Sequence, residues 1–147
     1  MRPLYIFDLD GTLALIEHRL HFIQGKRKDW RAFFAAVGDD KPNLPVIATL
    51  QALRKAGAEV WIWSGRSDEC KVQTVEWLQR HGCFGFPTDV LWAWPFGAPE
   101  RFRMRKAGDF TPDEELKRGW LAEMEPPEFS RLTAVFDDQR DTQGWRD

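Results

Sequence analysis

Four short runs of apolar residues recur along the chain, and each ends at a polar or turn-forming residue. Runs of this length without alternation are typical of strands that are buried on both faces of a parallel sheet. We therefore predict strands at residues 4–7, 59–63, 89–94 and 132–136.

Between these runs, apolar residues recur at helical spacing, and each helical pattern has a recognisable start. Asp29 is placed to cap the first helix and Ser67 the third. The last helix opens with the capping-box sequence Thr111-Pro112-Asp113-Glu114, and Pro126-Pro127 is expected to stop it. The predicted helices cover residues 29–37, about 45–56, 67–81 and 111–124. Residues 13–28 and 95–110 show no regular pattern.

Strands that alternate with helices predict an α/β fold with a parallel sheet, helices on both faces and right-handed crossovers. The length of 147 residues suits one domain, so we expect a single domain over residues 1–147. Trp61, Trp63 and Trp120 fall on core-facing positions of this arrangement.

Composition narrows the class of protein further. With 43% hydrophobic and 30% charged residues, the chain has enough apolar side chains for a core, which excludes wholesale disorder. A net charge of −2 excludes a generally basic nucleic-acid coat protein but leaves a local basic groove open. Two cysteines are too few for a disulfide scaffold.

The sequence shows neither a signal-peptide run nor a membrane-spanning stretch, so we expect a cytoplasmic protein. The sequence does not predict an oligomeric state.

Polar residues follow three of the predicted strands directly: Asp8 and Asp10, then Ser64-Gly65-Arg66, then Asp137-Asp138. The carboxyl edge of an open α/β sheet is where ligands bind, so these clusters are expected to converge. The alternative is that Asp, Ser and Gly simply end strands because they favour turns.

The first cluster offers two carboxylates that Gly11 lets the chain splay around one point. One carboxylate is able to attack an electrophile while the other moves a proton. With Asp137 or Asp138 the cluster becomes an oxygen-rich site suited to Mg²⁺. No Gly-rich nucleotide loop is present, so nothing indicates a kinase or an ATPase.

Asp8-Leu9-Asp10-Gly11-Thr12, Ser64-Gly65-Arg66, a later helical lysine and Asp137-Asp138 together resemble, in order, the four motifs of haloacid dehalogenase (HAD) phosphatases. This resemblance implies a three-layer, Rossmann-like fold with a small cap insertion at about residues 13–45. The chain is more specifically similar to the 3′-phosphatase domains of bacteriophage polynucleotide kinase/phosphatases. The residues that carry this closer match are Arg19, Arg105, Asp109, Asp113, Lys117 and the run 137–140.

The resemblance also implies a role for each matching position. Asp8 would be the nucleophile that forms an aspartyl-phosphate, and Asp10 the acid/base. Ser64 and Lys117 would hold phosphoryl oxygens, and Asp113 would orient Lys117 from one helical turn away. The resemblance further implies substrate contacts for four residues: Thr12, Arg19, Arg66 and Arg105. It implies that Mg²⁺ is bound by Asp8, the Asp10 carbonyl and Asp138, and that Asp137 supports Asp138.

Several of these side chains have plainer interpretations. Without the family match, Lys117 reads as an ordinary solvated lysine, and Lys106 competes for the phosphate. For Arg66 a contact with the substrate phosphate is favoured, and a surface ion pair is the alternative. His18 and His21 are three residues apart, but no matching Cys/His pair accompanies them, so they are expected to be surface or capping residues.

Basic residues concentrate in two segments, 18–31 and 101–106, despite the acidic total. Aromatic residues accompany them, among them Phe22, Trp30, Trp94 and Phe102. Such a rim is able to bind a phosphodiester backbone and stack a terminal base. We therefore expect a phosphorylated nucleic-acid end as the substrate. Two alternatives stay open: a phosphatase for a small molecule such as a nucleotide, and a non-catalytic nucleic-acid or protein-binding module.

Overall fold

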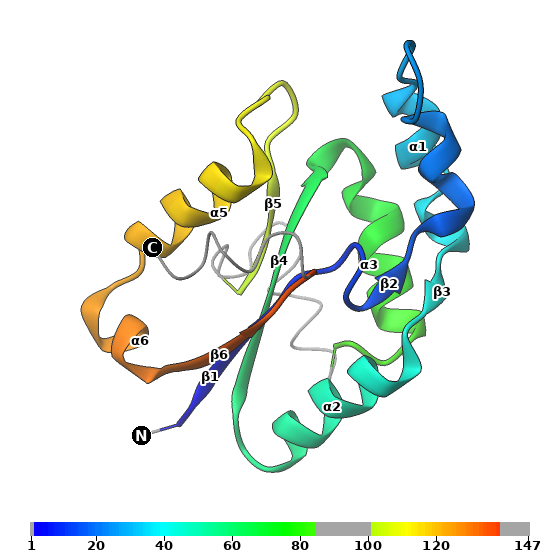
Figure 1. Cartoon of the computed structure of the whole chain (residues 1–147). Coiled ribbons are helices and arrows are strands. Elements are labelled where there is room, and N and C mark those ends of the chain that lie inside the picture. Colours follow the sequence, from blue (N-terminus) through cyan, green and yellow to red (C-terminus); the bar gives the residue numbers. More distant parts are fainter. Residues whose placement is uncertain (1, 85–100, 139–147) are drawn as a thin grey trace.

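A four-stranded parallel sheet forms the centre of the protein in a computed structural model that describes residues 2–84 and 101–138 (Figure 1). The strand order is β5-β4-β1-β6. The bounds are β1 Leu4–Phe7, β4 Glu59–Ser67, β5 Phe102–Arg105 and β6 Leu132–Phe136. This confirms the predicted parallel α/β fold. The strand predicted at 89–94 lies outside the described residues.

Two features of the sheet differ from the prediction. β4 continues through Ser64-Gly65-Arg66 to Ser67, because it pairs with β5 along this stretch, with a register shift between Ser64 and Ser67. β5 lies in a segment predicted to be irregular. In β5, Phe102 and Met104 alternate with arginines. The strand therefore lacks the continuous apolar run that predicted the other strands.

Helices cover both faces of the sheet and enclose two apolar cores. On one face, α2 (Leu44–Lys55) and α3 (Lys71–Arg80) pack Leu50, Trp77 and Leu78 against β1 and β4. On the other, α5 (Asp113–Ala122) packs Leu116 and Trp120 against Trp61 and Trp63. The predicted core positions of Trp61, Trp63 and Trp120 are confirmed. None of the helices in the described parts of the chain combines the length and apolarity that a membrane span requires.

Helix ends account for most of the remaining corrections. The helix predicted at 29–37 is α1 (Trp30–Ala35) followed by the 3-10 turn η2 (Val37–Asp39). The helix predicted from Ser67 starts as the 3-10 turn η3 (Asp68–Cys70).

The predicted capping box and helix stop are both wrong. The Thr111 hydroxyl donates to Asp109 and does not cap α5. Pro126-Pro127 begins the short helix α6 (Pro126–Arg131), because proline suits the first helical turn, where no backbone donor is needed.

Residues 13–45, which were predicted to form a small cap and are called the cap segment below, stand beside the carboxyl ends of the strands (Figure 1). Its base is the antiparallel pair β2 (Ala14–Leu15) and β3 (Lys41–Pro42). The 3-10 helix η1 (Glu17–Phe22), α1 and η2 lie between these two strands in the sequence. The loop between β5 and α5, residues 106–112, rises on the other side of the same sheet edge (Figure 1).

Candidate active site

The turn after β1 brings the first and last acidic clusters together. The backbone N–H of Asp8 donates to Phe136 O at 2.8 Å, which ties the end of β1 to β6. Gly11 then turns the chain at φ +79°, a conformation that favours glycine. A Cβ at Gly11 would lie 2.9 Å from Oδ2 of Asp138. Glycine therefore lets the Asp138 carboxylate approach the loop that carries Asp8 and Asp10.

Lys117 connects this loop to α5. Its side chain is 3% exposed, and its Nζ donates to Asp8 Oδ1 at 2.7 Å. The same Nζ lies 3.2 Å from Asp113 Oδ2, so the predicted i,i+4 ion pair is formed, and 4.0 Å from Asp137 Oδ1. One buried ammonium thus has carboxylates from three parts of the chain within 4.0 Å.

The electrostatics of Asp8 reflect this crowding. Burial raises the pKa of Asp8 well above its usual value, and the neighbouring carboxyl of Asp137 raises it further, while the Lys117 ammonium opposes the shift. Asp8 is therefore largely buried and close to other acids, and within residues 2–84 and 101–138 the cation that contacts it is Lys117.

Asp10 has the opposite surroundings. Arg19 donates to its Oδ1 from NH2 at 2.9 Å, and Arg66 donates to the same oxygen from Nε at 2.8 Å. Both guanidinium groups are fully buried. Burial alone would raise the pKa of Asp10, but Arg66 and Arg19 together hold it below its usual value. Oδ2 takes no part in these contacts.

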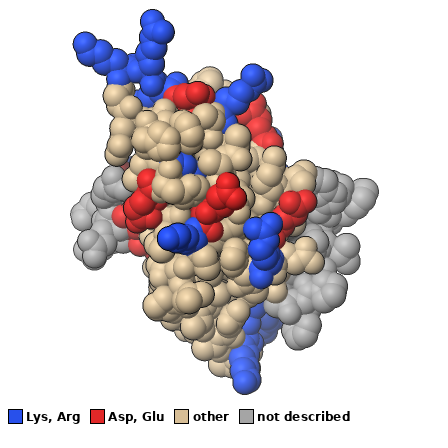
Figure 2. Space-filling model, turned by 90° about the vertical axis from the view of Figure 1, so that its right-hand side faces the viewer, with Lys and Arg blue, Asp and Glu red and all other residues tan. Residues whose placement is uncertain are grey.

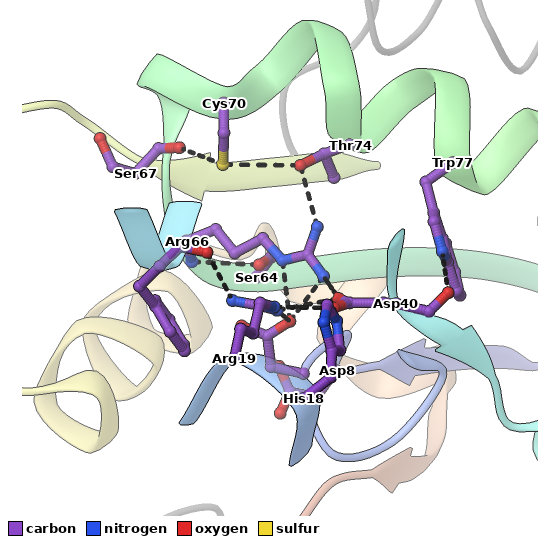
Figure 3. Close-up of polar contacts among 12 residues, drawn as sticks. Asp8, His18, Arg19, Asp40, Ser64, Arg66, Ser67, Cys70, Thr74 and Trp77 are labelled. Carbon is purple, nitrogen blue, oxygen red and sulfur yellow. Dashed lines mark hydrogen bonds and ion pairs between the residues drawn. The ribbon is translucent and has the colours of Figure 1, made fainter. Parts of the chain in front are cut away.

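Asp40 was not predicted and organises this part of the site (Figure 3). Its fully buried carboxylate accepts from His18 Nε2 at 2.6 Å, Arg19 Nε at 2.7 Å and Arg66 NH2 at 2.8 Å. Its backbone oxygen accepts from Trp77 Nε1 at 2.8 Å. Asp40 therefore holds both arginines that contact Asp10, and it joins the cap segment to α3.

The sequence offers no local signal for Asp40, because it follows Asp39 in a short polar turn and only burial distinguishes the two. His18 is an exposed residue, as predicted, and its ring also bonds to the buried carboxylate of Asp40. The predicted substrate contacts of Arg19 and Arg66 stay predictions; the structure places both guanidinium groups on Asp10 and Asp40.

Gly65 and Arg105 join β4 to the segment that leads into α5. A Cβ at Gly65 would collide with Oδ1 of Asp113, so only glycine allows Asp113 to lie here. Arg105 donates from Nε to Gly65 O at 2.8 Å and from NH1 to the backbone oxygens of Asp109 at 3.0 Å and Thr111 at 2.5 Å. Most N–H donors of the Arg105 guanidinium are thus used by backbone oxygens of the protein itself.

Ser64, predicted to hold a phosphoryl oxygen, and Thr12, predicted to contact the substrate, are both buried. The Ser64 hydroxyl is buried and accepts the backbone N–H of Arg66 at 3.1 Å. The buried Thr12 hydroxyl has no hydrogen-bond partner within residues 2–84 and 101–138, and the Thr12 carbonyl accepts from Asn43 Nδ2 at 2.9 Å. Contact of either hydroxyl with a phosphate stays a prediction.

A cleft of about 1230 Å³ opens above these residues. Asp8, Asp10 and Asp138 line it together with Gly65 and Arg66. The cap segment lines one side through residues that include Trp30 and Phe34, and residues 105 and 108–113 line another. The acidic centre is therefore accessible at the carboxyl edge of the sheet.

The donor set around the cleft fits Mg²⁺. In the part of the chain that the structure describes, no three acidic, histidine or cysteine side chains form a complete metal cage. Mg²⁺ needs fewer protein ligands, because it keeps several waters. Asp8 and Asp138 line the same cleft, and Asp138 lies against the loop that carries the Asp10 carbonyl. Asp137 Oδ1 accepts the N–H of Asp138 at 2.7 Å, which positions that ligand candidate.

Comparisons with known proteins agree with this geometry. Residues 2–147 match the family model described as "Polynucleotide kinase PNKP phosphatase domain". The solved structure described as "Structure of the Pnkp1/Rnl/Hen1 RNA repair complex" has a chain with a TM-score of 0.69 and 23% identity; the match covers 99% of this chain and 39% of that one. A second solved structure, "Structure of Pnkp1/Rnl/Hen1 complex", has a chain with a TM-score of 0.65 and 22% identity; the match covers 99% of this chain and 42% of that one. This chain thus spans about two fifths of the length of those chains. A comparison with curated proteins found no match.

Proposed function

The chain belongs to the PNKP phosphatase-domain family of HAD-type phosphatases, and we propose that it removes 3′-phosphate from polynucleotide ends through an Mg²⁺-dependent aspartyl-phosphate mechanism. The observation that carries the proposal is the pairing of Asp8 with Lys117 at 2.7 Å on a cleft that Asp10 also lines. In the proposed mechanism Asp8 is the nucleophile, Lys117 the cation for phosphoryl oxygens and Asp10 the acid/base, and their positions around one opening support the proposal.

The first step transfers the phosphoryl group to the protein. A carboxylate oxygen of Asp8 attacks phosphorus and the bond from phosphorus to the ester oxygen breaks. Protonated Asp10 gives its proton to the leaving 3′-oxygen. Because both arginines bond Oδ1 of Asp10, Oδ2 is the oxygen that carries this proton.

The second step regenerates the enzyme. Ionised Asp10 takes a proton from water, and the resulting hydroxide attacks the phosphorus of the aspartyl-phosphate. Inorganic phosphate leaves, Asp8 returns as a carboxylate and Asp10 is again protonated. The lowered pKa of Asp10 in the substrate-free protein favours the ionised form that this step needs and opposes the protonated form that the first step needs. The first step therefore requires that bound substrate raise the pKa of Asp10.

Lys117 offsets negative charge on the phosphoryl group in both steps, since its ammonium already contacts the attacking carboxylate. Asp113 holds the ammonium from one turn earlier. Bound Mg²⁺ would supply further charge neutralisation at the phosphoryl oxygens, with Asp8, Asp138 and the Asp10 carbonyl as its protein ligands.

The choice of a polynucleotide end rests on the family, on the cleft and on local charge. The matched chains come from complexes described as RNA repair or Pnkp1/Rnl/Hen1 complexes. The cleft exceeds the roughly 300–1,000 Å³ of common small-ligand pockets. Lys26, Arg27 and Lys28 are exposed on the cap segment, and basic side chains project at the top of the molecule, at the height of this segment (Figure 2).

The substrate class is tested by phosphate release from two matched substrates with and without Mg²⁺. One is a 3′-phosphorylated oligonucleotide and the other is a nucleoside 3′-monophosphate. We expect a much lower KM for the oligonucleotide and no release after chelation. Equal KM values would instead indicate a nucleotide phosphatase. Tight binding without release from either substrate would indicate a non-catalytic module.

The covalent step is tested with Asp8→Asn and the control Asp39→Asn, which changes an exposed aspartate. We expect Asp8→Asn to lose roughly 10³-fold or more in kcat and Asp39→Asn to match the wild type. Radiolabel from the 3′-phosphate should appear on the wild-type protein in an acid-stable, hydroxylamine-labile bond. Full turnover by Asp8→Asn would refute the aspartyl-phosphate mechanism.

A further inference from the structure

Two aromatic side chains that line the active-site cleft are unusually exposed. Phe110, in the loop between β5 and α5, is 93% exposed, and Trp30, at the start of α1, is 47% exposed. The cap segment carries Trp30 and the opposing loop carries Phe110, and the same cleft reaches Asp8. Exposed apolar side chains beside a catalytic centre are candidates for substrate contact.

The loop that presents Phe110 is held firmly. Asp109 and Thr111, the two neighbours of Phe110, both offer their backbone oxygens to Arg105. The Asp109 carboxylate also accepts the backbone N–H of Thr111 at 2.9 Å and its hydroxyl at 2.6 Å. The loop is further attached by the N–H of Ala107, which donates to Asp68 at 3.0 Å. Phe110 is thus exposed on a fixed backbone.

Trp30 is supported in a comparable way. Its ring stacks on Phe34 with centroids 5.9 Å apart and meets Phe33 edge-on at 5.7 Å. Lys28 Nζ lies 5.8 Å from the centre of the Trp30 ring. The ring therefore packs on two other aromatic side chains, and a lysine ammonium lies near its face.

We propose that Trp30 and Phe110 form a base-stacking subsite that receives the unpaired terminal nucleobases of the polynucleotide whose phosphate lies at Asp8. This proposal rests on the proposed function and names the part of the substrate that makes it a polynucleotide phosphatase. Aromatic side chains bind successive bases of single strands because every base has a π-face.

Charge near these rings favours a nucleic-acid strand as the occupant. Lys28 lies over Trp30, and Arg31, the next residue of α1, lines the cleft. Cations beside aromatic faces match an alternation of phosphates and bases. In this arrangement Arg105 acts as a positioning residue, because its bonds to the loop backbone set the place of Phe110.

The subsite is tested first by binding. The probe is a fluorescent, 3′-phosphorylated single-stranded oligonucleotide, and Asp8→Asn is the background, so that the substrate survives. We expect Phe110→Ala and Trp30→Ala each to weaken binding about tenfold, and Phe110→Trp to restore it. The matched control is Phe129→Ala, which removes a 56% exposed phenylalanine of α6 that is outside the cleft lining. It should bind like the background protein.

A second probe separates stacking from loop structure. It is the same oligonucleotide without bases on its last two nucleotides. If the rings stack on bases, the binding loss caused by Phe110→Ala should largely disappear on this probe. A loss of equal size on both probes would overturn the proposal, because it would show that Phe110 acts through the loop.

These readouts distinguish the proposal from the proposed function. A wild-type protein that releases phosphate from the oligonucleotide, with unchanged binding after both aromatic substitutions, refutes the subsite and leaves the phosphatase function intact. Binding that depends on Phe110 and on the terminal bases, without phosphate release by the wild type, supports the subsite and refutes the phosphatase function.

Discussion

The two aspartates that follow β1 are two residues apart and have opposite environments. Asp8 contacts one ammonium, Lys117, which two further carboxylates approach within 4.0 Å, and its pKa is raised. Asp10 contacts two buried guanidinium groups, and its pKa is lowered. The same short loop thus supplies one carboxylate for a site rich in acids and another for a cluster balanced by arginines.

The difference follows from the elements that surround each side chain. Asp8 faces α5 and the end of β6, which bring Lys117 and Asp137. Asp10 faces η1 and the end of β4, which bring Arg19 and Arg66. The second cluster is formally neutral, because it contains two carboxylates and two guanidinium groups. They belong to Asp10, Asp40, Arg19 and Arg66. We infer that the Asp8 side binds cation and phosphate, whereas the Asp10 side fixes the acid/base and anchors the cap segment.

The largest effect is expected on the Asp8 side. Lys117→Met keeps a long side chain and removes the cation that contacts Asp8, so kcat should fall roughly 10²–10³-fold. Steady-state phosphate release from a phosphomonoester measures this. Arg118→Met, at the neighbouring position where the side chain is 43% exposed, is the control and should retain wild-type kcat. A fall of less than about threefold in Lys117→Met would contradict the assigned role of the ammonium.

A smaller kinetic effect but a clear loss of stability is expected on the Asp10 side. Asp40→Asn removes one carboxylate from the four-charge cluster and leaves two buried guanidinium groups with Asp10 alone. We expect unfolding free energy to fall by about 3 kcal/mol and kcat to fall about tenfold, measured by urea unfolding and phosphate release. Asp39→Asn again serves as the control.

The positioning role of Asp40 has its own readout. Loss of its negative charge should lower the pKa of Asp10 further, which NMR titration of the Asp10 carboxyl measures. A destabilised Asp40→Asn protein with an unchanged Asp10 pKa would show that Asp40 acts only in folding.

The sequence predicted those parts of the molecule that local patterns encode. Continuous apolar runs indicated β1 and β6, although only β1 is largely buried, whereas the residues of β6 are partly buried or exposed. Helical spacing indicated α5 and the spacing of Asp113 and Lys117, because one turn of helix fixes their contact. The β5 strand escaped prediction, because an edge strand that alternates with arginine lacks this signal.

The rest depends on contacts between distant segments. Asp40 and Arg66 are 26 residues apart and meet only through the packing of the cap segment on α3 and β4. The family resemblance predicts Arg105 as a substrate contact, but its bonds to Gly65, Asp109 and Thr111 depend on how the loop folds back and have no local signal in the sequence. Phe110 reads as one more apolar residue, and only its exposure distinguishes it.

The smallest effect, and the most direct test of the comparison, is the acid dependence of stability without divalent cations. Because the folded-state pKa of Asp10 lies below the usual 3.8, its contribution is present at neutral pH. It is lost as pH falls through about 4 toward the folded-state pKa, since the unfolded chain binds the proton first. On acidification, the unfolding free energy of the wild type should therefore fall relative to that of Asp10→Asn.

Asp8 has a raised pKa, so its contribution to the unfolding free energy is present below about pH 4 and is lost as pH rises through the folded-state pKa. The corresponding difference between wild type and Asp8→Asn should therefore shift in favour of wild type over the same titration. Urea unfolding of the three proteins from pH 7 to pH 3 measures both slopes, and slopes of equal sign would show that the two environments do not differ as described.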